Sequence, residues 1–338
     1  MPANTGKHIL IVGTGSVGKR HAKNLHALGC VISCFDPNAG RCAELAGEIE
    51  LRGSYTEFDR VLEDARSFQG VVIASPPKFH VDQCLRLQAA GLPVLLEKPV
   101  SPAYEDARRL RDAETRSPLL LGYTWRWWKP LHRVRELLAQ RAVGEIHHVR
   151  MSMSAHLADW HPWEDYRSFF MASRDLGGGA LLDESHWIDL MLWFFGRPTH
   201  VFAQIAHISP LEIETDDNVD MLVTYPRTRV SIHLDLYGRP HEKRIVFCGD
   251  GGTIAWTVDP NRVCIGKKAA DEWEVEPFTV ERNDMFLDTA REFLGVIDGS
   301  PVRTCTIGEG IDVLRVVEAA RRSSSTGQSV QLDWGHEL

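Results

Sequence analysis

The sequence predicts an α/β protein with a doubly wound parallel sheet in its N-terminal half and an α+β domain with a large, mostly antiparallel open sheet in its C-terminal half. Two patterns predict this fold. Short apolar runs alternate with amphipathic helical segments up to about residue 122, whereas beyond residue 130 apolar and polar residues alternate with a period of two. The length of 338 residues also favours two domains, which we place at 1–125 and 126–338.

The parallel sheet is predicted from apolar runs that are short enough for buried strands. Between them lie segments whose apolar residues recur at helical spacing. The predicted strands are 9–12, 31–35, 71–74, 94–96 and 119–122, and the predicted helices are 16–28, 39–46 and 79–90.

The second sheet is predicted from alternation that begins at Val149, Met151 and Met153. The pattern returns at 219–225 and 230–236, and weaker β patterns follow at 245–247, 253–257 and 262–265. An amphipathic helix is predicted at 307–322, packing back near the domain boundary, followed by a polar Ser/Thr/Gly turn and a short strand. Because one face of such a sheet is left over, we expect a homodimer or homotetramer through it.

Composition excludes several classes of function. The net charge of −8 and the absence of a long basic run argue against nucleic-acid binding. Seven scattered cysteines without a CxxC pair favour reduced thiols and give no zinc site, and His147, His148, His156 and His161 lack ligand spacing, so we expect no metal. We expect neither a signal peptide nor a membrane span, and therefore a cytoplasmic protein.

A glycine-rich motif, G-T-G-S-V-G at 13–18, follows the first predicted strand and opens the first helix. Such glycines allow a tight turn, the approach of backbone amides to a pyrophosphate, and close packing of helix on strand. Asp36 ends the next strand 18 residues after the motif, near the spacing of about 20 for a carboxylate that holds the adenosine ribose. These features predict a Rossmann domain that binds NAD; Arg41 leaves NADP open. The predicted contacts are Gly13, Gly15, Ser16, Val17, Gly18 and Asp36.

The loop after strand 71–74 lies where ligands of doubly wound sheets bind, at the carboxyl end of a strand. We expect Ser75, Pro76, Pro77 and His80 to line the cofactor cleft. The alternative is that the two prolines only shape the loop and that His80 starts the next helix.

Glu97-Lys98-Pro99, together with the glycine motif and Pro76-Pro77, resembles the Gfo/Idh/MocA family of glucose-fructose oxidoreductases and inositol dehydrogenases, and the match covers nearly the whole chain. The resemblance implies that Glu97 and Lys98 lie at the cofactor, that Lys98 binds both nicotinamide and substrate, and that the Lys98–Pro99 peptide is cis. An ammonium beside the reacting C–O bond would stabilise the negative charge that develops there.

Residues 176–189 resemble the glycine-led helix that carries the family's catalytic histidine, which implies His186 here. Asp183 lies three residues before it, so on one helix the two would share a face, and a carboxylate there would orient the imidazole. Many family members have the aspartate four residues before the histidine, so Asp189 is an alternative support.

Two further segments are candidates for contact with substrate. Tyr123 to Pro130 resembles the family's crossover between domains, where Arg126 would approach substrate or nicotinamide, or instead form a salt bridge. The aromatic and polar loop 159–167 suits stacking on sugar faces, although it could equally form an interface or a folded cap. Its candidate residues are Trp160, His161, Trp163, Tyr166 and Arg167. Residues 215–218 are interpreted as a solvated turn, although their carboxylates could instead contact substrate.

Together these residues predict an NAD(P)-dependent dehydrogenase that acts on a CH–OH group of a sugar, polyol or sugar derivative. The loop 159–167 resembles a branch associated with surface-polysaccharide and amino-sugar pathways, which implies an activated or amino sugar. Two alternatives stay open: an NAD-recycling glycoside hydrolase or lyase of the same family, and a regulatory protein that senses the cofactor without catalysis.

Overall fold

The computed structural model describes residues 6–113, 117–160, 162, 164–267 and 272–335. The chain forms two compact units, Met1–Trp127 with Glu281–Ile311, and Trp128–Val280 with Asp312–Leu338. The sequence-based division differs in two respects: it placed the boundary between residues 125 and 126, and it placed Glu281–Ile311 in the second domain. This segment belongs to the first unit because its helix α9 (Arg282–Ile297) packs against α1 (Ser16–Ala27).

The first unit contains a six-stranded parallel sheet in the order β3-β2-β1-β4-β5-β6, which confirms the doubly wound prediction. β1, β4, β5 and β6 are buried along their whole length, as apolar strands between helical layers must be. The strands are β1 (His8–Val12), β2 (Val31–Phe35), β3 (Leu51–Tyr55), β4 (Gly70–Ile73), β5 (Val94–Glu97) and β6 (Leu119–Gly122).

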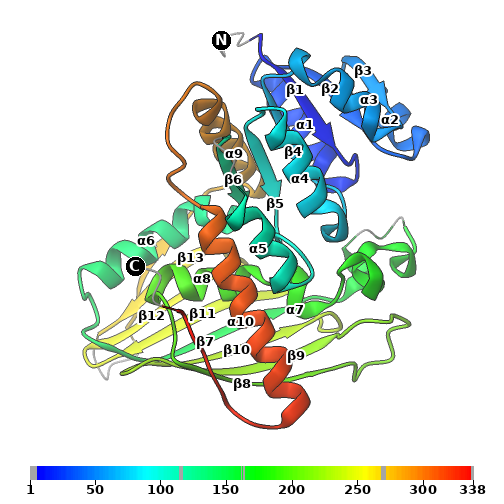
Figure 1. Cartoon of the computed structure of the whole chain (residues 1–338). Coiled ribbons are helices and arrows are strands. Elements are labelled where there is room, and N and C mark those ends of the chain that lie inside the picture. Colours follow the sequence, from blue (N-terminus) through cyan, green and yellow to red (C-terminus); the bar gives the residue numbers. More distant parts are fainter. Residues whose placement is uncertain (1–5, 114–116, 161, 163, 268–271, 336–338) are drawn as a thin grey trace. The chain divides into compact units, whose positions relative to one another are not determined.

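Helices cover both faces of this sheet (Figure 1). α1 and α9 lie side by side on one face, and α4 and α5 pack together on the other. α9 begins with a capping box formed by Glu281 and Asp284. The remaining helices of the unit are α2 (Ala39–Ala46), α3 (Phe58–Glu63), α4 (His80–Ala89) and α5 (Tyr104–Asp112).

The second unit contains a nine-stranded sheet in the order β14-β13-β12-β11-β7-β10-β9-β8-β15. Neighbouring strands are antiparallel except β10 and β7, so the prediction of a mostly antiparallel sheet is confirmed. The strands are β7 (Ile146–Ser154), β8 (His200–Ala206), β9 (Asn218–Thr224), β10 (Arg229–Asp235), β11 (Glu242–Gly249), β12 (Gly252–Thr257), β13 (Arg262–Gly266), β14 (Glu274–Pro277) and β15 (Val330–Gln331).

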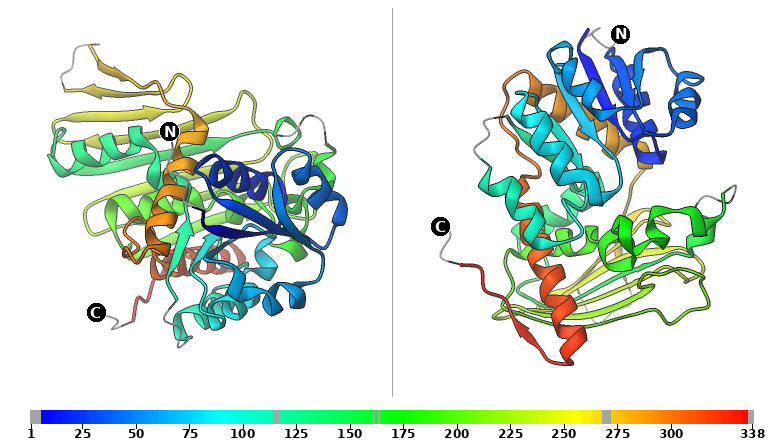
Figure 2. Two further views of the ribbon diagram at one scale, coloured as in Figure 1. Left: turned by 90° about the horizontal axis from the view of Figure 1, so that it is seen from above. Right: turned by 45° about the vertical axis from the view of Figure 1, so that its right-hand side comes forward.

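One face of this sheet carries the helices of the unit, α6 (Lys129–Ala139), α7 (Ala180–Asp183), α8 (His186–Phe195) and the second-unit part of α10 (Ile307–Thr326). None of the described helices lies on the opposite face (Figure 2). Buried residues such as Met151 and Met153 point to the helices, and the residues between them point to the open face. None of the helices in the described ranges is long and apolar enough to cross a membrane.

α10 extends through the Ser/Thr segment that the sequence led us to expect as a turn. Ser323 and Ser324 explain this difference, because their hydroxyls accept hydrogen bonds from the backbone of β8, at 3.0 Å from the amide of Ala203 and 2.9 Å from that of Ile205. The polar residues therefore dock the end of the helix on a strand.

Candidate active site

The glycine motif forms the turn from β1 into α1. Gly13 has a positive φ of 88°, and a Cβ at this residue would lie 2.6 Å from the backbone nitrogen of Ser75. A Cβ at Gly15 would meet nothing within 4 Å, and no side chain caps the first turn of α1. Open space above uncapped amides at a helix N-terminus fits the pyrophosphate of a dinucleotide.

Asp36, at the end of β2, is 4% exposed and is bonded to the glycine turn. The backbone N–H and the hydroxyl of Thr14 donate to its Oδ2 at 3.0 and 3.1 Å, and the N–H of Asn38 donates to its Oδ1 at 2.9 Å. The carboxylate therefore orders the turn as well as placing a negative charge beside it. Arg41 is exposed on α2.

The loop after β4 lies next to the glycine turn. Ser75 donates its hydroxyl to Gln83 at 2.6 Å, and Pro77 is buried. His80 is 1% exposed, and its two ring nitrogens lie 2.8 Å from the carbonyl oxygen of Pro99 and 2.7 Å from that of Ser75. The sequence left two alternatives for His80, a place in the cofactor cleft or the start of the next helix. His80 is the first residue of α4, and both of its ring nitrogens contact the backbone.

Lys98 follows β5 at the same edge of the sheet, because the carboxyl ends of parallel strands lie together. Its side chain is half-buried, and the Lys98–Pro99 peptide is cis, as the family resemblance implied. Glu97 is 6% exposed, and its Oε1 accepts a hydrogen bond from Nε2 of His21 on α1 at 2.6 Å. The carboxylate of Glu97, which the resemblance places at the cofactor, is bonded within the unit to His21 and to the backbone N–H of Lys98.

Arg126 is 1% exposed and forms a salt bridge with Glu309, at the start of α10. The same guanidinium donates to the carbonyl of Thr304 at 2.9 Å. Burial opposes ionisation of Glu309, but the charge of Arg126 and hydrogen bonds from Thr306 lower its pKa. The salt bridge, one of the two alternatives for Arg126, is present in the structure.

In the second unit, three glycines precede the segment with Asp183 and His186. A Cβ at Gly178 would lie 2.3 Å from the carbonyl oxygen of Met171, and Gly179 has a φ of 108°. The single helix we expected is broken: α7 ends at Asp183, and α8 begins at His186. The spacing of three therefore does not place these two residues on one continuous helical face. Asp183 and Asp189 are both buried, and His186 is half-buried.

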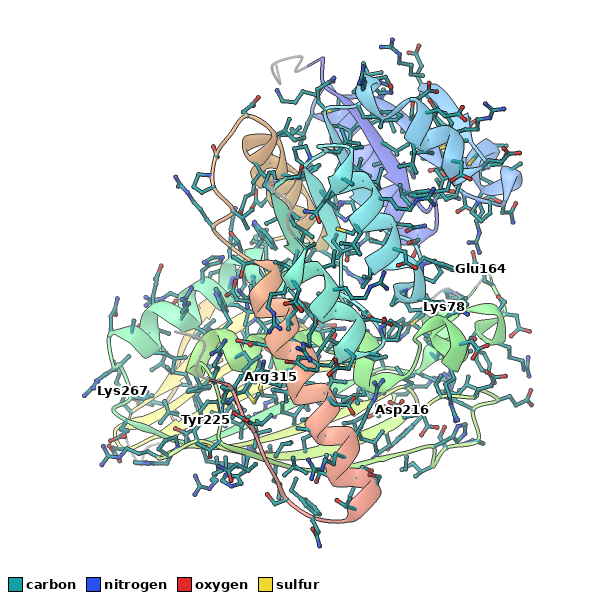
Figure 3. The ribbon with its side chains drawn as sticks, in the orientation of Figure 1. Lys78, Glu164, Asp216, Tyr225, Lys267 and Arg315 are labelled. Atoms are coloured by element: carbon teal, nitrogen blue, oxygen red, sulfur yellow. The ribbon has the colours of Figure 1, made fainter. Side chains whose placement is uncertain are left out.

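Asp216 accepts hydrogen bonds from the start of this segment, a structural role that the sequence did not indicate. Its Oδ2 accepts from the N–H of Leu181 at 2.8 Å, and its carbonyl accepts from Ala180 at 2.9 Å (labelled in Figure 3). Burial raises the pKa of Asp216, although the bond from Leu181 opposes this shift. Asp217 is fully buried and accepts bonds from Ile208 and Ser209, so the prediction of a solvated turn at 215–218 was wrong. The sequence feature that could have indicated these bonds is the pair of aspartates directly before the alternating strand, because aspartate side chains often bond nearby backbone amides.

The aromatic loop before the glycines consists largely of short 3-10 turns. Arg167 is bonded to Glu212 and Asp165 and lies over the ring of Tyr166. With Glu212, it lines a depression of about 390 Å³. Trp160 is half-buried. His161 and Trp163 lie outside the described residues.

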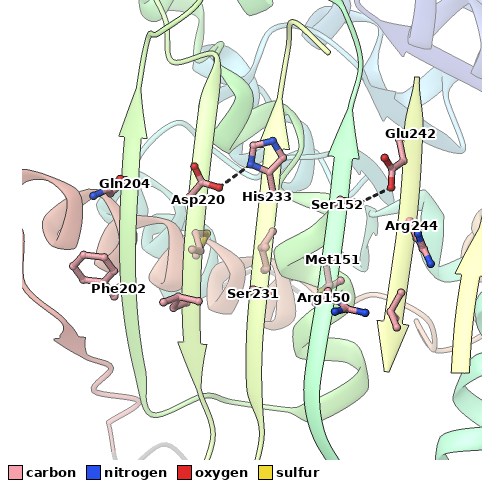
Figure 4. Close-up of a pocket in the computed structure, with 14 residues that line it drawn as sticks. Arg150, Met151, Ser152, Phe202, Gln204, Asp220, Ser231, His233, Glu242 and Arg244 are labelled. Atoms are coloured by element: carbon pink, nitrogen blue, oxygen red, sulfur yellow. Dashed lines mark hydrogen bonds and ion pairs between the residues drawn. The ribbon is translucent and has the colours of Figure 1, made fainter. Parts of the chain in front are cut away.

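A second depression, of about 600 Å³, lies on the open face of the nine-stranded sheet (Figure 4). A row of polar side chains crosses five neighbouring strands here, in the order Gln204, Asp220, His233, Ser152 and Arg244. Asp220 contacts His233 at 2.7 Å, and Ser152 donates to Glu242 at 3.0 Å. Across the described residues, no group of three or more His, Cys, Asp or Glu is placed to hold a metal ion.

Comparison with known proteins agrees with this architecture. Residues 7–124 match the model of the oxidoreductase family with an NAD-binding Rossmann fold, and residues 131–255 match the GFO/IDH/MocA C-terminal domain. The chain belongs to the Gfo/Idh/MocA family. Its first unit is accordingly the NAD-binding Rossmann domain of that family, and its second unit contains the Gfo/Idh/MocA C-terminal domain.

Individual relatives of this Gfo/Idh/MocA protein match over part of their length. The rhizopine catabolism protein MocA of Rhizobium meliloti is 31% identical over 196 residues, covering 56% of this chain and 58% of that protein. Inositol 2-dehydrogenase of Leifsonia xyli subsp. xyli is 31% identical over 198 residues, covering 56% and 54%. Levoglucosan dehydrogenase in complex with NADH superimposes with a TM-score of 0.86 at 17% identity, covering 97% of this chain and 99% of that one, which shows a shared fold.

Proposed function

We propose that the protein is an NAD-dependent dehydrogenase that oxidises a secondary alcohol of a sugar, polyol or sugar derivative, or reduces the corresponding ketone. The observation that carries the proposal is the position of Lys98, at the end of β5 on the sheet edge that also carries the glycine turn. The inositol 2-dehydrogenase among the relatives supports a polyol or sugar as substrate.

In the proposed reaction, a dinucleotide held by the glycine turn and Asp36 would supply the acceptor for the hydride of the carbinol carbon. Lys98 stabilises the negative charge on the substrate oxygen as its proton leaves. His186 accepts that proton, and Asp183 or Asp189 stabilises the imidazolium that results. The products are a ketone, the reduced cofactor and a proton on His186, and the reverse direction uses the same groups.

The test is a nicotinamide absorbance assay with NAD or NADP and a panel of inositols, hexoses, amino sugars and sugar nucleotides. We expect turnover that falls by at least about 100-fold in Lys98→Met and in His186→Gln, since each removes one group that acts on the reacting oxygen. Arg291→Gln, on the exposed side of α9 where Arg291 pairs with Asp288, is the matched control and should retain activity.

The same panel separates the rival functions. Cleavage of glycosides without net absorbance change, in a protein that retains its cofactor, would identify the NAD-recycling hydrolase or lyase. Binding of NADH without turnover of any substrate would contradict the dehydrogenase and favour the cofactor sensor.

We also propose that the open face of the nine-stranded sheet is where two copies of this chain associate. The face presents arginines and carboxylates side by side, so opposite charges can meet when it pairs with its own copy, and Leu222 on it is 59% exposed. Light scattering at micromolar concentration should give a dimer or tetramer mass, and Leu222→Glu should lower it. A monomer mass for the unaltered protein would contradict this proposal.

A further inference from the structure

His21 is buried in the first unit next to the strand that carries Lys98. It lies on the inner side of α1 and is 0% exposed. Its Nε2–H donates to the Glu97 carboxylate at 2.6 Å, and its ring packs edge-on against Phe286 of α9 at 5.6 Å. Within the described part of the chain, Nδ1 of His21 has no hydrogen-bond partner. The polar contact of this ring is therefore made through one nitrogen.

Glu97 transmits this contact to Lys98. Its second carboxylate oxygen accepts a hydrogen bond from the backbone N–H of Lys98 at 3.3 Å. The carboxylate lies over Gly122 of β6, where a Cβ would come within 3.1 Å of it. A neighbouring strand and helix thus fix the side chain that bonds the amide of Lys98.

His80 contacts the other side of the same turn. One ring nitrogen lies 2.8 Å from the carbonyl oxygen of Pro99, the residue after Lys98, and the other lies 2.7 Å from that of Ser75. A carbonyl oxygen only accepts, so each bond needs a ring N–H: a neutral ring serves one carbonyl at a time, and the imidazolium serves both. His80 therefore lies between the carbonyl oxygens of the Lys98 turn and of the loop after β4, and it bonds both at once only when its ring is protonated.

We propose that His21 and His80 are positioning residues for Lys98, which hold the Glu97–Pro99 turn from its two ends. We call this pair the histidine clamp. Its catalytic consequence rests on the proposed dehydrogenase function, whereas its effect on the order of the turn does not. Both rings are buried and bonded within the protein, so they act through Glu97 and through the backbone.

The clamp matters because an ammonium stabilises a developing charge only at hydrogen-bond distance. A displacement of about 1 Å in such a group can cost about 100-fold in rate. Lys98 has a long, flexible side chain, so a fixed backbone reduces the number of positions that its ammonium samples.

Amide side chains test the contacts one nitrogen at a time. Gln places its N–H₂ near the position of Nε2, and Asn places it near Nδ1. Because His21 bonds through Nε2, His21→Gln should preserve the clamp and His21→Asn should break it. At His80, Asn retains the Pro99 contact and Gln retains the Ser75 contact.

Asn24→Ala is the control, because Asn24 joins α1 to α9 through Asn283 and has no bond to Glu97.

The first readout is hydrogen exchange, which does not depend on activity. We expect amide exchange in the peptide covering residues 94–101 to become about tenfold faster in His21→Asn and His80→Gln, since their turn contacts are lost. His21→Gln and Asn24→Ala should match the unaltered protein there. In His80→Asn, the faster exchange should move to the peptide covering residues 74–79.

The second readout separates turnover from cofactor binding. With a substrate found in the panel, His21→Asn should lower kcat by about 10- to 100-fold while the Kd for NADH changes less than about threefold. His80→Asn should raise the Kd for NADH, because the loop after β4 is released, and His21→Gln should restore kcat.

Two results would overturn the clamp. One is exchange at 94–101 that is unchanged in both His21→Asn and His80→Gln. The other is equal behaviour of His21→Asn and His21→Gln, which would indicate loss of packing instead of loss of the Glu97 bond. If the unaltered protein shows no turnover, the dehydrogenase proposal fails, whereas hydrogen exchange still decides the clamp.

Discussion

At the scale of single residues, Asp36 combines two tasks that are hard to separate in sequence. Its carboxylate accepts three hydrogen bonds, two from Thr14 and one from Asn38, and it also places negative charge beside the glycine turn. The bonds hold the turn, and the charge disfavours a 2′-phosphate.

Substitution of Asp36 should separate these tasks. Asp36→Asn keeps one carbonyl oxygen as acceptor and removes the charge, so we expect discrimination against NADP to fall by about 10-fold or more. Asp36→Ala also leaves the donors of Thr14 without their acceptor, which should cost about 1–3 kcal/mol of unfolding free energy. Ratios of kcat/KM for NAD and NADP, with urea unfolding of each variant, give the measurement. Unchanged discrimination in Asp36→Asn would contradict the assignment.

The positions of candidate residues could be predicted where they depend on nearby sequence. They could not be predicted where they depend on packing between distant parts of the chain. The glycine turn, Asp36 and Lys98 could be located because each follows a strand in a doubly wound sheet. The bonding partners of His21, His80 and Arg126 could not be predicted, because they lie 76, 19 and 183 residues away in the chain. The sequence indicates that His21 lies on the buried side of a helix, but this pattern does not identify the residue to which His21 bonds.

At the scale of elements, the open face of the nine-stranded sheet contains a charged cluster that spans two strands. His233 of β10 contacts Asp235 on the same strand and Asp220 on β9. The hydrogen bond to Asp235, with that to Asp220, raises the pKa of His233 to about 9. The folded protein therefore binds this proton more tightly than the unfolded chain does.

This cluster predicts a loss of stability at alkaline pH. Its contribution is complete below the ordinary histidine pKa of 6.5 and is lost as the pH rises through about 9. Because His233 is 39% exposed, screening should limit the effect to about 1 kcal/mol or less. Urea unfolding of His233→Gln between pH 6 and 10, at one protein concentration, should show a shallower decline than the unaltered protein and Ser231→Ala do. An equal decline in all three would contradict it.

Strands were predicted well where burial is uniform and poorly where their residues are largely part-exposed. β1 and β4 to β6 are continuous apolar runs and were all expected, whereas β3 is an edge strand that contains Arg52 and Gly53 and was missed. β8 and β14 were missed too. The break between α7 and α8 was also missed, because Asp183 to Phe195 has helical spacing throughout and the interruption depends on local backbone geometry.

At the scale of the whole molecule, the first unit is built from two separate stretches of the chain. α9 packs on α1, and its side chains also reach β4. A Cβ on Gly70 of β4 would lie 2.6 Å from the side chain of Ile297 and 3.0 Å from that of Phe293. Residues 1–127 alone would expose this apolar contact to water.

We therefore expect the fragment 1–127 to be unstable by itself. Joining it to 281–311 through a Gly/Ser linker restores α9, and the joined fragment should unfold cooperatively in urea and bind NADH. Circular dichroism and fluorescence titration of both fragments give the measurement. Cooperative unfolding and NADH binding by the fragment 1–127 alone would show that α9 is dispensable.

The return of the chain at residue 281 also affects the order of events during synthesis. The strands of the parallel sheet leave the ribosome first, yet the helix that covers α1 and β4 is complete only after residue 297. At about 5–20 residues per second, translation of the intervening stretch takes roughly 10–30 s. During this time an apolar face of the nascent sheet stays exposed to water. A trigger-factor-type or Hsp70-type chaperone can bind that face until α9 covers it.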